Sequence, residues 1–113
     1  MTDCDLGRRQ RIALLNDQLR HRMPVAHCFM TQGVEALPIR LKRAAIERVR
    51  TFDAFGEDND PHGEHDFGNF ELESIKFFWK IDYYDHSLQG SSPDPTDPKV
   101  TRRILTIMIA NEY

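Results

Sequence analysis

Residues 70–84 read FELESIKFFWKIDYY and carry the clearest pattern in the chain. Apolar residues alternate with polar ones on both sides of Ser74, and a period of two predicts strands with one buried face. A tight turn at Ser74 would join the strands into a hairpin. Lys76 and Lys80 are then expected to face Glu71 and Glu73 across it. Aromatic residues on the more polar face indicate that this face is also partly covered. They are Phe78 and Tyr84.

Two helices are predicted before this hairpin. Over residues 5–23, apolar residues recur every three or four positions and end at Pro24, as in an amphipathic helix. The stripe consists of Ile12, Leu15, Leu19 and Met23. Most of the basic residues outside it are expected in solvent; these are Arg9, Arg11, Arg20 and His21. A second helix is predicted from Pro38, because proline favours the first helical position. Its buried stripe consists of Leu41, Ala45, Val49 and Phe52. Its outer face is predicted to carry solvated ion pairs among Arg40, Arg43, Glu47 and Arg50.

The other segments complete an α+β pattern. Residues 25–31, VAHCFMT, are short, apolar and flanked by Pro24 and Gly33, which favours a strand. Glycine, proline and acidic residues predict loops over 56–68 and 85–98. Residues 101–110 are predicted as a strand on their β-branched content, with a helix as the alternative. We therefore expect two helices packed on a small antiparallel sheet of three to four strands, in the order α-β-α-β-β-β. Residues 1–113 would form a single domain, with 1–10 as a candidate disordered segment.

The composition excludes a membrane protein but does not indicate any particular activity. The chain has 113 residues, 29% of them charged, and no apolar run long enough to span a bilayer. No export signal is visible, so we expect a cytoplasmic protein in which Cys4 and Cys28 are free thiols.

Charge is strongly segregated along the chain. Residues 1–52 carry a net +5, residues 53–97 a net −10 and residues 98–113 a net +2. Either the basic helices neutralise the acidic loops in the fold, or the surface is bipolar and steers a charged partner.

Two loops hold most of the residues that can do chemistry. The candidate binding residues are Asp58, Asp60, His62, Glu64, His65, Asp66, Asp85 and His86. Imidazole and carboxylate ligate zinc, manganese or iron, so His62, His65 and Asp66 are the ligands to expect if a metal binds. A calcium loop does not fit, since its twelfth position would be Asn69. The alternative is a loop that hydrogen-bonds to itself, with His65 paired to an acid such as Asp82.

Several blocks of sequence resemble the bacterial domain-of-unknown-function family numbered 3768. The blocks are IALLND (12–17), TQGVEALP (31–38), GEHDFG (63–68), WKIDYYD (79–85), SPDPTDP (92–98) and TRRILTIMIANEY (101–113). The resemblance implies a small bacterial protein without an assigned activity and transfers no catalytic residue. Families of this kind often travel on plasmids and phages, which suggests an inhibitor of host defence of the anti-CRISPR or anti-restriction type.

The sequence therefore favours a non-enzymatic protein-binding module without a cofactor. Its interface is expected on loops 57–66 and 85–97, with Trp79, Tyr83 or Tyr84 as anchors where exposed, although the core is the expected place for Trp79. The alternative is a small metal-dependent hydrolase or nuclease that uses the His/acid loop over residues 58–66. Direct nucleic-acid binding by Arg40, Arg43 and Arg50 is a weaker interpretation, because the net charge is −3. The oligomeric state is left open.

Overall fold

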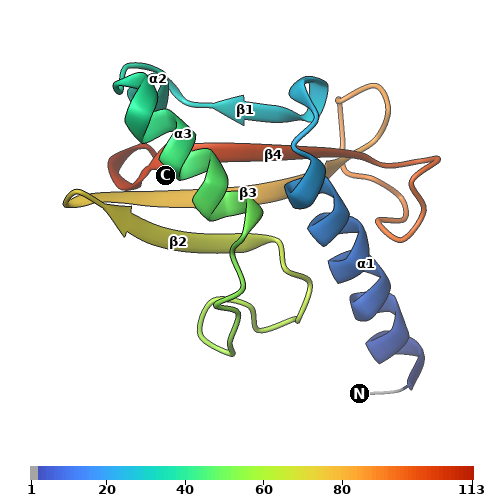
Figure 1. Ribbon diagram of the computed structural model, residues 1–113. Helices are drawn as coiled ribbons and strands as arrows, with labels where there is room; N and C mark the ends of the chain where they lie inside the picture. Colours follow the sequence, from blue (N-terminus) through green and yellow to red (C-terminus); the bar gives the residue numbers. More distant parts are fainter. Residues whose placement is uncertain (1–2) are drawn as a thin grey trace.

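The computed structural model describes residues 3–113, with the side chains of the first helix described from residue 7 onward. The elements are α1 (Asp3–Arg22), the 3₁₀ helix η1 (Val25–His27), β1 (Cys28–Met30), α2 (Gln32–Glu35), α3 (Ile39–Arg50), β2 (Phe67–Leu72), β3 (Ile75–Tyr84), β4 (Arg102–Ile109) and η2 (Ala110–Glu112). The predicted α+β class is confirmed (Figure 1). No helix in residues 3–113 is long and apolar enough to cross a membrane.

The predicted hairpin is formed by β2 and β3. Leu72 pairs with Ile75, so Glu73 and Ser74 form a two-residue turn, and both have positive φ angles, 49° and 69°. Such turns match the twist of the strands they join. Glu71 lies opposite Lys76 as predicted. The predicted contact between Lys80 and Glu73 is wrong, because Glu73 belongs to the turn.

Lys80 has other neighbours. It lies opposite Phe67 in the β2–β3 register, and its ammonium pairs with the Asp82 carboxylate at 3.0 Å.

The sheet has the strand order β1-β4-β3-β2. Residues 102–109 form a strand, as predicted, antiparallel to β3. The sheet is mixed rather than wholly antiparallel, because β1 pairs with β4 in parallel. β1 is also shorter than the predicted strand, since the His27 N–H donates to the Pro24 carbonyl and closes the turn of η1. The short helix α2 was not predicted.

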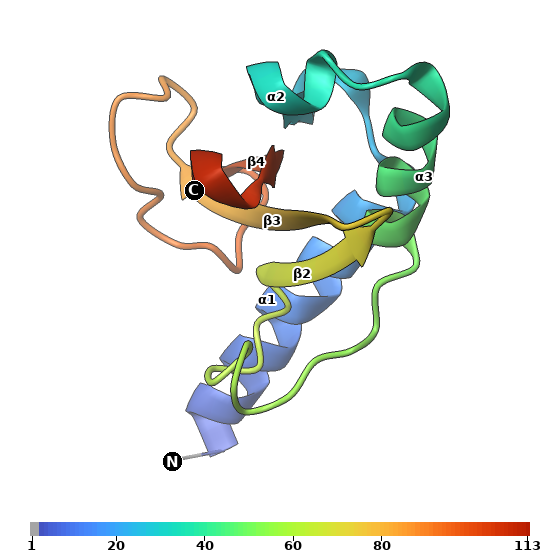
Figure 2. The same ribbon diagram turned by 90° about the vertical axis from the view of Figure 1, so that its left-hand side faces the viewer.

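The core lies between one face of the sheet and the helices. Phe77, Trp79 and Ile81 alternate inward along β3 and are at most 4% exposed. They pack with Ala45 and Val49 of α3. Figure 2 shows α3 on one side of the strands, and the C-terminal segment with the 85–101 loop on the other.

The helix α1 begins earlier than predicted and buries a different face. The candidate disordered segment is 1–10; within it, residues 3–10 are helical and residues 1–2 lie outside the described part of the chain. Ile12 is buried, but its face continues through Asn16 and Arg20, which are 0% and 2% exposed. The predicted position of Arg20 in solvent is therefore wrong. The other members of the apolar stripe are only half-buried. They are Leu15, Leu19 and Met23.

Candidate functional site

The candidate site is the loop over residues 53–66, called the acidic loop below, together with the inward face of α1 that holds it. Arg20 forms the first anchor. One guanidinium nitrogen donates to the carbonyls of Val49 and Phe52 at 2.8 and 2.9 Å, and the other donates to Asp17 Oδ1 at 2.7 Å. The last carbonyls of a helix have no partner within it. Arg20 therefore caps α3 where the acidic loop begins, and Asp17 neutralises it.

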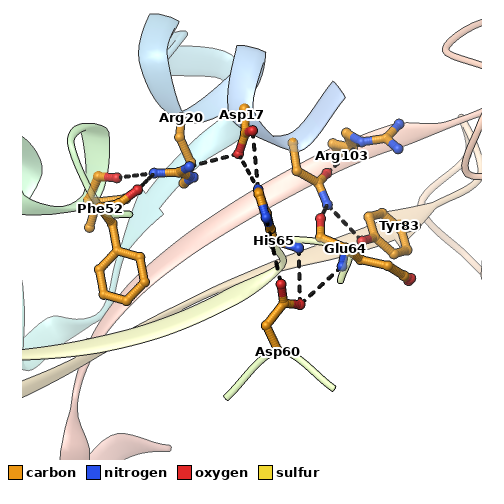
Figure 3. Close-up of polar contacts among 10 residues, drawn as sticks. Asp17, Arg20, Phe52, Asp60, Glu64, His65, Tyr83 and Arg103 are labelled. Carbon is orange, nitrogen blue, oxygen red and sulfur yellow. Dashed lines mark hydrogen bonds and ion pairs between the residues drawn. The ribbon is translucent and has the colours of Figure 1, made fainter. Parts of the chain in front are cut away.

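His65 forms the second anchor. Its Nδ1 lies 3.0 Å from Asp17 Oδ1, and its Nε2 lies 3.8 Å from Asp60 Oδ2 (Figure 3). The ring stacks on Phe55 with centroids 4.0 Å apart and planes 2° from parallel. Because Nδ1 contacts Asp17 of α1, His65 fastens the acidic loop to this helix, and Nε2 faces the Asp60 carboxylate within the loop.

The backbone of the loop is fixed by two further buried side chains. Asp60 is 8% exposed, and its Oδ1 accepts from the N–H groups of Glu64 and His65 at 3.0 and 3.2 Å. Asn16 donates to the Glu64 carbonyl at 3.0 Å and to the Tyr83 hydroxyl at 2.8 Å. These contacts run from α1 through the loop to β3. The conformation of the loop thus depends both on its own Asp60 and on Asn16, which is far away in sequence.

Side-chain pKa values in this region are raised by burial and by the closeness of other acidic groups. Desolvation raises the pKa of Glu64, and the neighbouring Asp66 carboxylate raises it further. Desolvation also raises the pKa of Asp66. The Tyr83 hydroxyl has its pKa raised for the same reason. The inner part of the acidic loop therefore favours protonated, uncharged groups more than free side chains do.

The structure brings together only some of the predicted site residues. Asp60, Glu64 and His65 meet at α1, whereas Asp58 and His62 are exposed. Among the side chains that the structure describes, those of residues 7–113, no group of three or more His, Cys, Asp or Glu is arranged to hold a metal ion, so His62, His65 and Asp66 do not form one.

Asp82 is also not the partner of His65. It pairs with Lys80, and the carboxylates near His65 belong to Asp17 and Asp60.

The second loop organises itself locally. Asp85 Oδ1 accepts from the Ser87 hydroxyl at 2.7 Å and from the Gln89 N–H at 3.2 Å, and these bonds lower the pKa of Asp85. His86 contacts the carbonyl of Lys99 through Nε2. Both residues therefore shape the loop and lie apart from the His65 cluster. Of the expected aromatic anchors, Trp79 is fully buried, while Tyr83 and Tyr84 are half-buried.

The sequence interpretation missed the residues of α1 that build this site. Asn16 and Arg20 follow Ile12 at intervals of four, which places all three on one helical face. That spacing was the available signal. Asp17, three residues before Arg20, was the second, because opposite charges at this spacing are neighbours on a helix.

Comparisons with known proteins place the chain in a family without giving it an activity. No curated protein and no solved structure matches it. Residues 30–112 match the family described as "Protein of unknown function (DUF3768)". This match spans well over half of the chain and includes the acidic loop, all four strands apart from the first two residues of β1, and helices α2 and α3. The chain therefore belongs to the DUF3768 family of proteins of unknown function.

Proposed function

We propose that the protein is a non-enzymatic protein-binding module whose binding surface is the acidic loop. The observation that carries the proposal is the anchoring of this loop by Asn16, Asp17 and Arg20, while its outer carboxylates face solvent. Asp53, Glu57 and Asp58 are all exposed. A long segment without helix or strand is usually functional or disordered. Here buried contacts hold it, so little ordering entropy remains to be lost on binding.

The charge of the loop defines the class of partner. Fixed carboxylates complement a basic protein groove and accelerate its encounter with the module. Such grooves are typical of nucleic-acid-binding proteins. An inhibitor of a defence enzyme that binds nucleic acid, of the anti-CRISPR or anti-restriction type, is the specific form we favour.

The test is affinity capture from bacterial lysate with a charge-reversed module carrying Asp53→Lys, Glu57→Lys and Asp58→Lys. The matched control carries three reversals elsewhere, at Glu35, Glu47 and Glu71, which are exposed on α2, α3 and β2. We expect a basic, nucleic-acid-binding protein to be retained by the unmodified chain and by the control, and lost by the loop variant. Equal retention by both variants would overturn the proposal, as would a captured protein without affinity for nucleic acid.

A further inference from the structure

A pocket of about 350 Å³ lies between the C-terminal half of α1, η1 and the beginning of β4. Its polar side chains are Gln18, Arg22, His27, Thr101 and Arg103, and Leu15 and Leu19 contribute to its apolar wall. No acidic residue of the described chain lines it, although acids outnumber bases in the sequence. The pocket is therefore a cationic site on an acidic protein.

Arg103 is the unusual member of this pocket. It is only 8% exposed, and its Nε donates to Asn16 Oδ1 at 2.8 Å, while Nη2 donates to the Pro95 carbonyl. Its Cζ lies 5.1 Å from the centre of the Tyr83 ring. All these partners are neutral. Among residues 7–113 no carboxylate lies within ion-pair distance of Arg103; desolvation lowers its pKa, and the more distant Glu64 carboxylate opposes this shift.

Arg20 is a second buried arginine of this fold, and its charge is balanced by a carboxylate. It is 2% exposed, and the Asp17 carboxylate lies 2.7 Å from its guanidinium. A buried charge without a counter-ion is costly, and one with a hydrogen-bonded partner much less so. Arg103 has the burial of Arg20 without the carboxylate, at a position that opens on a pocket.

Arg22 supplies a second positive charge to the lining of this pocket. Arg22 is exposed in the last turn of α1, and none of the ion pairs in the described structure includes it. His27 contacts the carbonyl of Arg103 through Nδ1 at 3.1 Å, which holds η1 against β4. The Thr101 hydroxyl already donates to the Asp94 carbonyl at 2.7 Å. The donors left for a ligand are therefore the guanidinium groups of Arg22 and Arg103 and the amide of Gln18.

We propose that this pocket binds the oxyanion of a small ligand, a phosphate ester or a carboxylate, between Arg103 and Arg22. A guanidinium presents paired N–H donors that match both anions. The apolar wall formed by Leu15 and Leu19 would contact the organic part of the ligand. The site differs from the acidic loop in charge and in lining residues, and Asn16 connects the two, because it accepts from Arg103 and donates to the Glu64 carbonyl.

The experiment titrates the full-length protein with phenyl phosphate, benzoate and inorganic phosphate at constant ionic strength, measured by calorimetry and by chemical shifts of the Thr101 and Arg103 amides. Arg22→Gln removes the exposed cation and leaves Arg103 in place. Arg43→Gln, on the exposed face of α3, is the matched control.

We expect saturable binding of at least one aromatic anion, with shifts at both amides. Arg22→Gln should weaken it at least tenfold, and Arg43→Gln should leave it unchanged. The stronger of phenyl phosphate and benzoate identifies the anion, and inorganic phosphate reports how much the organic part contributes. Absence of saturable binding, or equal weakening by both substitutions, would overturn the proposal. Arg103→Lys keeps the buried charge and should weaken binding without unfolding the chain.

Discussion

Replacing Arg20 by methionine is expected to reduce the free energy of unfolding by about 3–5 kcal/mol. The Phe52 carbonyl would lose its 2.9 Å hydrogen bond, at about 1–3 kcal/mol for a buried acceptor left unpaired, and the Val49 carbonyl would keep only the 3.4 Å bond from the Phe52 N–H. Asp17 would lose a charge-assisted bond of 2.7 Å, worth about 1.5–3 kcal/mol before screening by solvent. Relief from burying the guanidinium offsets part of this sum.

Urea unfolding, followed by circular dichroism and by the fluorescence of Trp79, measures this change. Arg43→Met on the exposed face of α3 is the control and should change stability by no more than about 0.5 kcal/mol. Amide hydrogen exchange at Glu64 and His65 should accelerate in the Arg20 variant alone, because the acidic loop loses its anchor. A loss below about 1 kcal/mol, with unchanged exchange at these amides, would refute the anchoring role.

Three further predictions concern single sites. In Gly68→Ala, the new Cβ would lie 2.4 Å from Trp79 Nε1, so we expect a loss of about 1–3 kcal/mol in urea unfolding, and a neutral effect would contradict the packing. Burial raises the pKa of Glu64 above its ordinary 4.5, so the folded state binds the proton more tightly than the unfolded state does. The stability that this proton contributes is present at low pH and is lost as the pH rises through the pKa of the folded state. Glu64→Gln should therefore stabilise more at pH ~7 than at pH ~3, and equal effects at both would count against it. Burial raises the pKa of the Cys28 thiol to about 11, so alkylation at pH ~8 in a Cys4→Ser background should be about a hundredfold slower than in urea, as mass spectrometry would show.

The hairpin was predictable because its determinants are local. The alternation over residues 70–84 is present in the sequence itself, and strand pairing across a two-residue turn follows from it. The place of β1 was not predictable in this way. Its three residues pair with Leu105, Thr106 and Ile107, across two helices and the hairpin, and so short a strand has no pattern that specifies its partner. The parallel edge of the sheet is therefore a product of tertiary packing.

The candidate site was half predictable for a related reason. The ionisable residues of the acidic loop stand out in the sequence, and Asp60 and His65 do meet. Asp17, the other partner of His65, comes from a helix nearly fifty residues earlier, and only the packing of α1 brings it there. Arg20 lies outside the apolar stripe of α1 in the sequence, and a charged side chain is seldom fully buried unless it is paired. The pairing with Asp17 is what permits its burial.

The segregation of charge along the chain is only partly cancelled by the fold. Arg8 pairs with Asp94, and Arg40 with Glu73, but the side chains of both pairs are 43–68% exposed. Such solvent-exposed pairs contribute little to stability and weaken with salt. Stability therefore rests on the apolar core and on Arg20, which contacts backbone carbonyls and one carboxylate. Because Asp53, Glu57 and Asp58 are not needed for this, their charges can be changed without dismantling the fold, and stability and binding become separable properties of the same loop.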